Sequence, residues 1–109
     1  PYDLIFDEMI DRWEADAHYN KMVLTQIESQ ANNVLRNRGY LFLNEVYHMI
    51  GRYSSGESIY TPQGQIVGWL YDPNKESLQN CVKFGLDKMQ GDRSVVLHFN
   101  IDGPIIDKI

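Results

Sequence analysis

One amphipathic stretch, residues 17–38, constrains the fold of this chain more than any other feature of the sequence. Apolar side chains recur there at spacings of three and four, and most polar side chains fall on the opposite side. This periodicity is typical of a helix that packs one face on a core. At 1.5 Å per residue such a helix would be about 33 Å long, the width of a small domain. The apolar stripe consists of Val23, Ile27, Ala31 and Val34, widened by Leu24 and Leu35.

Both ends of this stretch carry residues that favour the start and the end of a helix. Asp16 is suited to the N-cap, because its carboxylate can accept hydrogen bonds from the backbone N–H groups of the first turn. Gly39 suits the left-handed conformation in which many helices end. Arg36 and Arg38 would complement the negative end of the helix dipole. We therefore expect the helix to begin after Asp16 and to end before Gly39.

Residues 39–51, GYLFLNEVYHMIG, predict a short strand followed by a short helix. Residues 40–43 are aromatic or aliphatic, as in a strand, and Asn44 is a residue type that caps helices. Val46, Tyr47 and Ile50 would then join Leu43 on one face, and Gly51 would end the helix.

The second half of the chain predicts strands. Residues 65–71 read as a strand followed by a turn at 72–74, and residues 82–87 and 95–101 alternate apolar with polar side chains. Gly91 and Asp92 would join the last two strands in a C-terminal hairpin. Residues 52–64, rich in Ser, Gly and Pro, predict a long loop.

The opening of the chain allows two interpretations. A helix would place Phe6, Ile10, Trp13 and Ala17 on one face, whereas a strand at residues 4–6 would lead through a charged turn to residues 12–14.

Together these elements predict an α+β fold, with one long and one short helix packed on a small, mostly antiparallel sheet that ends in a hairpin. The 109 residues suit a single domain, residues 1–109. Because the chain starts at Pro1 instead of Met, we expect it to be the C-terminal soluble part of a longer protein.

The charge and hydropathy of the chain disfavour two classes of partner. There are 10 Lys and Arg against 15 Asp and Glu, a net charge of −5, so direct binding to nucleic acid is not expected. No apolar run approaches the ~20 residues that a membrane-spanning helix needs. The single cysteine, Cys81, excludes an internal disulfide and fits a reducing compartment.

The sequence contains no recognisable catalytic, cofactor or metal motif. His18, His48 and His98 have no second His or Cys at metal-ligand spacing, and Cys81 has no base placed to activate it. We therefore expect a non-enzymatic protein without a cofactor. An acidic run lacks the EF-hand spacing and predicts a solvated face, or a surface that imitates DNA for a partner protein. This run is Asp7, Glu8, Asp11, Glu14 and Asp16.

Aromatic residues supply the candidates for a protein-binding surface. Trp69 follows Gly68, which permits close approach of the backbone, and it is either a binding anchor or, as we favour, part of the core. An exposed apolar patch would combine Trp69 with residues of the predicted loop. The candidate interaction residues are Trp69, Tyr53, Ile59, Tyr60, Asp7, Glu8, Asp11 and Glu14.

The pattern GYxFxNEVYxxIG at residues 39–51, with the later Gly68-Trp69 pair, resembles an uncharacterised family of small bacteriophage and prophage proteins. Proteins of that family carry a GYxYxNExYxxLG unit and often have apolar, membrane-anchoring segments ahead of it. The resemblance implies that the opening forms a hairpin-like pair of strands. It implies no catalytic residues.

These observations lead to one functional hypothesis and two alternatives. The hypothesis is a phage-type accessory domain that binds a host or phage protein in the host cytoplasm, tethered to the inner face of the membrane by an upstream anchor. The alternatives are a virion or assembly component that self-associates into a homo-oligomer, and an acidic inhibitor of a host nucleic-acid-binding protein.

Overall fold

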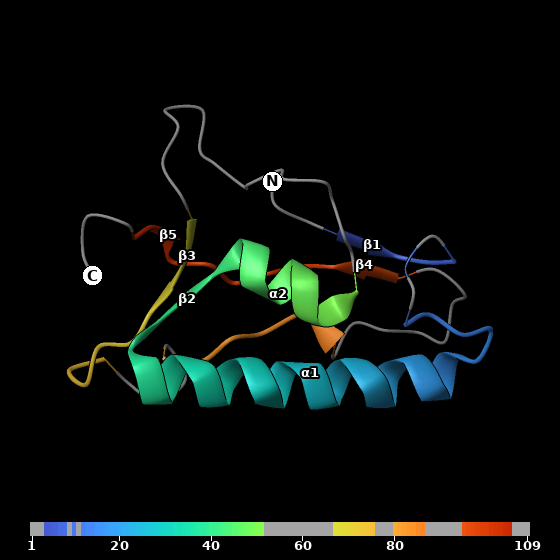
Figure 1. Ribbon diagram of the computed structural model, residues 1–109, viewed down its shortest axis with the longest axis horizontal. Helices are drawn as coiled ribbons and strands as arrows, with labels where there is room; N and C mark the ends of the chain where they lie inside the picture. The colour runs from blue at the N-terminus through green and yellow to red at the C-terminus, as the bar shows by residue number, and fades with distance from the viewer. Residues whose placement is uncertain are drawn as a thin grey trace.

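The computed structural model describes residues 4–8, 10, 12–51, 67–75, 80–86 and 95–105. These residues form two helices and five short strands, which Figure 1 shows with the long helix along one side of the molecule. In chain order they are β1 (Leu4–Phe6), α1 (Ala17–Arg38), β2 (Tyr40–Phe42), α2 (Leu43–Ile50), β3 (Val67–Leu70), β4 (Val95–Leu97) and β5 (Gly103–Pro104).

The strands form two small antiparallel sheets, and the α+β fold predicted from the sequence is confirmed. β1 pairs with β4, and β2, β3 and β5 lie in the order β2-β3-β5. Both helices pack on this framework, with α2 between the strands and α1 in the view of Figure 1. The core between them is built around large side chains with less than 2% exposure, among them Trp69, Phe6 and Phe84.

The long helix has the predicted bounds and caps. The Asp16 carboxylate accepts hydrogen bonds from the backbone N–H groups of His18 and Tyr19 at 3.0 and 3.1 Å. Gly39 ends the helix with φ of 91°, a left-handed conformation that costs glycine little. These contacts involve only near neighbours in the chain, which is why the sequence alone could predict them.

The buried face of α1 is rotated from the predicted stripe. The buried residues are Asn20, Leu24, Ile27, Ala31 and Leu35. Val23 and Val34, which we expected at the centre of the stripe, are half-buried at its margins. The buried face includes one polar residue, Asn20. Its side chain accepts a hydrogen bond from the Glu14 N–H at 2.9 Å and donates one to the Glu14 carbonyl oxygen at 2.7 Å. A buried amide satisfied in this way costs little.

The unit at residues 40–51 forms a strand and a helix as predicted, but its predicted cap is wrong. α2 begins at Leu43, so Asn44 lies inside the first turn. The Glu45 carboxylate instead reaches back and accepts a hydrogen bond from the backbone N–H of Phe42 at 3.0 Å. Gly51 ends the helix with φ of 98°, as expected.

The opening forms a strand, so the helical interpretation is wrong. Leu4 and Phe6 point into the core and Ile5 points out. The hairpin-like pair of strands that the resemblance implied is also wrong, because residues 12–14 form no strand. Trp13 there is half-buried and packs against the core. β1 pairs instead with β4 near the other end of the chain.

The C-terminal region keeps the predicted alternation but differs in its pairing. Val95 and Leu97 are buried and Val96 is exposed. The ladder partner of β4 is β1, whereas residues 82–86 form no strand, and Gly85 among them has φ of 74°. That segment lies beside the chain after β4 through a hydrogen bond from the His98 N–H to the Phe84 carbonyl, 3.0 Å. The predicted turn at residues 91–92 and the predicted loop at 52–64 lie outside the described residues.

Candidate functional site

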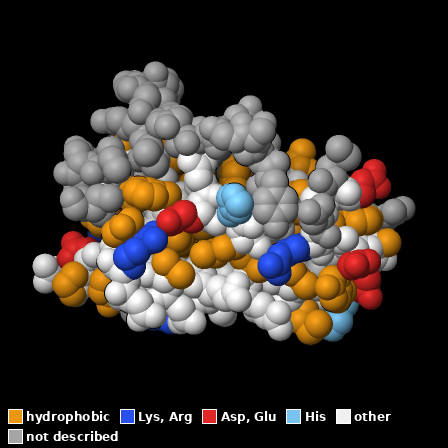
Figure 2. Space-filling model, in the orientation of Figure 1, with side chains coloured by type: hydrophobic (Ala, Val, Ile, Leu, Met, Phe, Trp, Pro, Cys, Tyr) orange, Lys and Arg blue, Asp and Glu red, His pale blue; other side chains and the backbone are white. Residues whose placement is uncertain are grey.

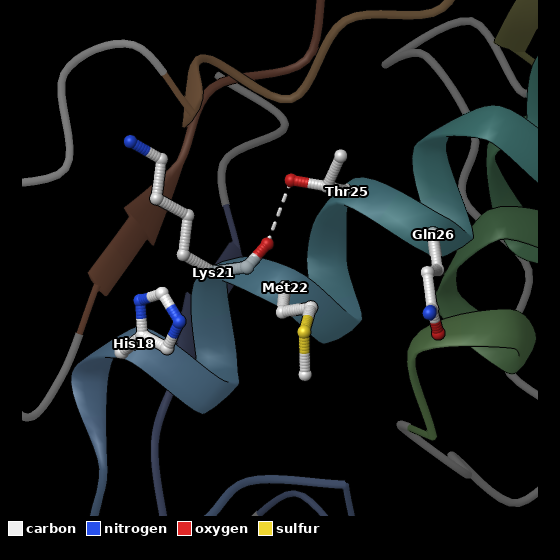
Figure 3. Close-up of a pocket in the computed structure, with 5 residues that line it drawn as sticks. All are labelled: His18, Lys21, Met22, Thr25 and Gln26. Atoms are coloured by element: carbon white, nitrogen blue, oxygen red, sulfur yellow. Dashed lines mark hydrogen bonds between the residues drawn. The ribbon is translucent and has the colours of Figure 1, made fainter.

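A shallow groove lies on the outer side of α1. Its volume is about 310 Å³. Figure 3 draws the side chains that line it. α1 turns Leu24, Ala31 and Leu35 to the core, so the groove lies on the side of the helix that the domain leaves open. Its lining consists of His18, Lys21, Met22, Thr25 and Gln26.

The lining residues form two parallel rows along the helix. His18, Met22 and Gln26 stand at i, i+4 and i+8, and Lys21 and Thr25 form the neighbouring row at the same spacing, as Figure 3 shows. Rows of this kind are the ridges between which the side chains of another helix insert when helices pack. The groove is therefore the space between two adjacent ridges.

The surface that lines the groove is mostly apolar. Met22 is 49% exposed, although it lies on a helix whose other large aliphatic side chains are buried or half-buried. The Thr25 hydroxyl donates to the Lys21 carbonyl oxygen at 2.7 Å, so its polar atom is satisfied within the helix. Tyr19, 39% exposed, adds an aromatic side chain nearby on the same helix. Methionine is a flexible and polarisable side chain that adapts to varied partners.

The charge of α1 differs in sign from that of the chain. The helix carries three cations, Lys21, Arg36 and Arg38, and one carboxylate, Glu28, giving 3 − 1 = +2 in a chain of net charge −5. Glu28 is half-buried and accepts a hydrogen bond from the Phe84 N–H at 3.0 Å. In Figure 2 acidic side chains gather where α1 begins, and none lies over its middle on the visible face.

A second depression, about 370 Å³, lies between α1 and residues 82–86. It is lined by Glu28, Lys83, Gly85 and Leu86. Because the Glu28 carboxylate holds the segment in place through Phe84, its role here is structural.

The histidines considered as acid–base or metal candidates are not brought together. His18 lies on α1, His48 on α2 and His98 after β4, and all three are exposed. Over the described ranges, no group of three or more His, Cys, Asp or Glu side chains is arranged to hold a metal ion. Within the same ranges, neither helix is both long enough and apolar enough to cross a membrane.

The residues predicted for an interaction surface are only partly described. Trp69 is 1% exposed, and its indole N–H donates to the Asn100 Oδ1 at 2.9 Å. Trp69 is therefore a core residue and not an exposed binding anchor. Glu8 and Glu14 are exposed and Asp7 is half-buried. The other four predicted residues, Tyr53, Ile59, Tyr60 and Asp11, lie outside the described residues.

The sequence analysis missed the groove. Its one available sign was Met22, an apolar residue placed opposite Ala31 and Leu35 on the helix. A single residue of this kind is common on protein surfaces, so the pattern alone did not identify a site.

The fold and its surface define a small α+β domain with a shallow groove on the open side of its long helix. The chain belongs to a family of unknown function, DUF6353, whose model matches residues 1–109. No curated protein and no solved structure matches the chain.

Proposed function

We propose that this domain is non-enzymatic and acts by binding another protein through the groove face of α1. The observation that carries the proposal is the exposure of Met22, an apolar side chain set among the polar and cationic side chains that line the groove. Exposed apolar surface set within a polar rim is typical of protein-binding sites.

Covering the exposed Met22 side chain would be energetically favourable. Removal of apolar surface from water stabilises a complex by about 25 cal/mol per Å², and a central side chain in a desolvated pocket often dominates an interface. A stable interface needs about 800 Å² on each side. The contact therefore extends beyond the groove along α1, over the exposed residues Ser29, Asn33 and Arg36.

The biological setting of this proposal follows from the motif at residues 39–51. We infer a phage-type accessory domain that meets its partner in the host cytoplasm, with an anchor upstream of Pro1. This setting is supported by the sequence resemblance, whereas the groove supports the binding itself.

The proposal can be tested by site-specific photocrosslinking in the cell that naturally carries the chain. A photoreactive amino acid replaces Met22 on α1 and, in a matched control, Val96 on β4, which is 46% exposed. We expect one protein to crosslink at position 22 and not at position 96. Failure of position 22 to crosslink any protein, or identical products from both positions, would refute the proposal.

A further inference from the structure

We infer that Met22 is a modification site, whose oxidation to methionine sulfoxide by hydrogen peroxide or a related two-electron oxidant prevents binding at the groove of α1. The effect on binding rests on the proposed function, whereas the oxidation itself depends only on the exposure of the side chain. Two features of the structure support the inference: the position of Met22 relative to the core, and the residues beside it on the helix.

Met22 is the more exposed of the two methionines that the structure describes. It is 49% exposed, whereas Met49 on α2 is half-buried and packs against the core. The other two methionines, Met9 and Met89, lie outside the described residues. Because a dissolved oxidant must reach the sulfur, susceptibility to oxidation follows exposure. Met22 should therefore be oxidised before Met49.

The reaction adds one oxygen atom to the thioether of Met22. The sulfur donates a lone pair to one oxygen of the peroxide, a sulfur–oxygen bond forms and the oxygen–oxygen bond breaks. The leaving hydroxide takes the proton of the transferred hydroxyl group and becomes water, so the sulfur is oxidised and the peroxide is reduced. Methionine sulfoxide reductases reverse the change, so a site of this kind can be used repeatedly.

The surroundings of Met22 accommodate the sulfoxide in the free domain. His18 and Gln26 lie four residues before and after Met22 in the same row, and both are exposed (Figure 3). Side chains at this spacing are neighbours on a helix, and the Gln26 amide and a His18 ring nitrogen can donate a hydrogen bond to the sulfoxide oxygen. Met22 is also not part of the buried core. Oxidation should therefore leave the fold unchanged.

The added oxygen opposes the complex. A partner that covers Met22 removes the oxygen from water, where it accepts more than one hydrogen bond. A single bond from His18 or Gln26 does not replace this hydration, and an incompletely bonded polar group in an interface weakens binding. The oxidation also replaces apolar surface, whose burial favours association, with polar surface. Its effect therefore falls on the complex and not on the stability of the domain.

The first test measures oxidation of the purified domain in dilute hydrogen peroxide. Peptide mass spectrometry follows the gain of one oxygen atom at each methionine with time. We expect Met22 to be oxidised several times faster than Met49. We also expect the circular dichroism spectrum and the urea midpoint to stay unchanged while Met22 is oxidised. Oxidation of Met49 at an equal or higher rate, or unfolding that accompanies oxidation of Met22, would overturn the inference.

The second test measures binding in an extract of the cell that naturally carries the chain. A photoreactive amino acid replaces Thr25, a lining residue in the neighbouring row, so that Met22 keeps its sulfur. We expect peroxide treatment before irradiation to reduce the crosslink in proportion to the fraction of Met22 that is oxidised. A purified methionine sulfoxide reductase should restore it, because this enzyme acts on methionine sulfoxide and not on an oxidised cysteine such as Cys81.

Three variants assign the effect to Met22. Met49→Leu lies outside the groove and should remain as sensitive to peroxide as the wild type. Met22→Leu removes the sulfur and should give the same crosslink yield with and without peroxide. Met22→Gln places a polar side chain at the same position and should reduce the crosslink about tenfold without any peroxide.

The outcomes separate the inference from the proposed function. If the crosslink at position 25 forms and does not respond to oxidation of Met22, the inference fails and the proposed function stands. The same holds if Met49→Leu abolishes the response or if the reductase does not restore the crosslink. If neither position 22 nor position 25 crosslinks a protein, the proposed function itself fails, and the effect on binding fails with it.

Discussion

The backbone carbonyl oxygen of Leu41 occupies the space where a side chain at Gly68 would begin. A β-carbon built on Gly68 would overlap this oxygen and would lie 2.9 Å from the Cα of Phe42. Gly68 pairs with Phe42 in the β2–β3 ladder, next to the pair of Leu41 with Trp69. The absence of a side chain at residue 68 therefore lets the strand that carries Trp69 pack closely against β2.

Replacement of Gly68 by alanine should destabilise the domain by about 3 kcal/mol or more, because backbone atoms of β2 would have to move. Gly39→Ala is the matched control, since a β-carbon there meets nothing within 4 Å and the cost comes from φ of 91° alone, about 1 kcal/mol. Urea unfolding followed by circular dichroism measures both. Equal losses of stability would contradict the account of close strand packing.

The Asn100 side chain forms hydrogen bonds with three groups of the protein. Its removal should therefore lower the free energy of unfolding more than removal of most surface side chains does. Its Oδ1 accepts from the Trp69 indole N–H at 2.9 Å and from the Lys83 N–H at 2.7 Å, and its Nδ2 donates to the Cys81 carbonyl at 2.9 Å. Asn100→Ala should lower the free energy of unfolding by about 1–3 kcal/mol, because the buried indole loses its acceptor.

The control for this variant is Asn33→Ala, which removes one exposed hydrogen bond to Arg36 and should cost less than about 0.5 kcal/mol. The Asn100 variant should also shift the emission of Trp69, measured in a Trp13→Phe background. An unchanged spectrum together with unchanged stability would show that Asn100 does not hold the indole.

Truncation of a side chain should destabilise the domain strongly on the buried face of α1 and hardly at all on its exposed face. Leu24→Ala removes a fully buried side chain and should cost about 2–5 kcal/mol. Met22→Ala truncates a side chain that is 49% exposed and should change stability by no more than about 0.5 kcal/mol. Chemical denaturation of both variants checks the orientation of the helix. A large loss at Met22 would mean that the groove face is part of the core.

The ion pair between Arg38 and Glu45 connects the end of α1 with the start of α2. The two side chains are 36% and 35% exposed, with 2.5 Å between the Arg38 Nη2 and the Glu45 Oε2. Arg38 also stacks over the Tyr40 ring, 4.1 Å from its centroid. Because the pair is open to solvent, Glu45→Gln should cost less than about 1 kcal/mol. Glu45→Ala should cost about 1 kcal/mol more, since the Phe42 N–H then loses its acceptor as well.

The pKa of Arg38 determines how the contribution of this ion pair to stability depends on pH. The hydrogen bond to Glu45 raises the pKa of Arg38 above its ordinary value. A group whose pKa is higher in the folded than in the unfolded state gives its full stabilisation at any pH below the unfolded-state pKa. For Arg38 this stabilisation is lost only as the pH rises through the folded-state pKa, in strongly alkaline solution. The stability difference between the wild type and Arg38→Met should therefore be the same at about pH 6 and about pH 9. A difference that shrinks over this interval would contradict the assignment.

Capping and periodicity made much of the helical structure predictable. Asp16 bonds to N–H groups two and three residues away, and Gly39 takes its left-handed conformation beside Arg38, so both ends of α1 follow from neighbours in the chain. The prediction failed at Asn44 because Glu45 offered a competing local contact to Phe42. Propensity alone did not choose between two adjacent polar residues.

The candidate site was not predictable in the same way. Met22 contributes a groove only because the core is formed by Leu24, Ala31 and Leu35, and the sequence placed the centre of the buried face nearer Val23 and Val34. A rotation of the buried face changes which outer residues remain in water. That rotation depends on partners elsewhere in the chain, including Val82, whose N–H donates to Asn32 of α1 at 2.6 Å.

The sequence by itself determined the long helix, its two caps, the short helix after it and the alternation of Val95, Val96 and Leu97. These features depend on contacts within a turn or on the period of side chains along one element. Only the tertiary structure decided that β1 pairs with β4, that Trp69 lies in the core and that Met22 faces water. The physical reason is that burial of apolar surface between distant segments is non-directional, so local patterns do not specify which segments meet.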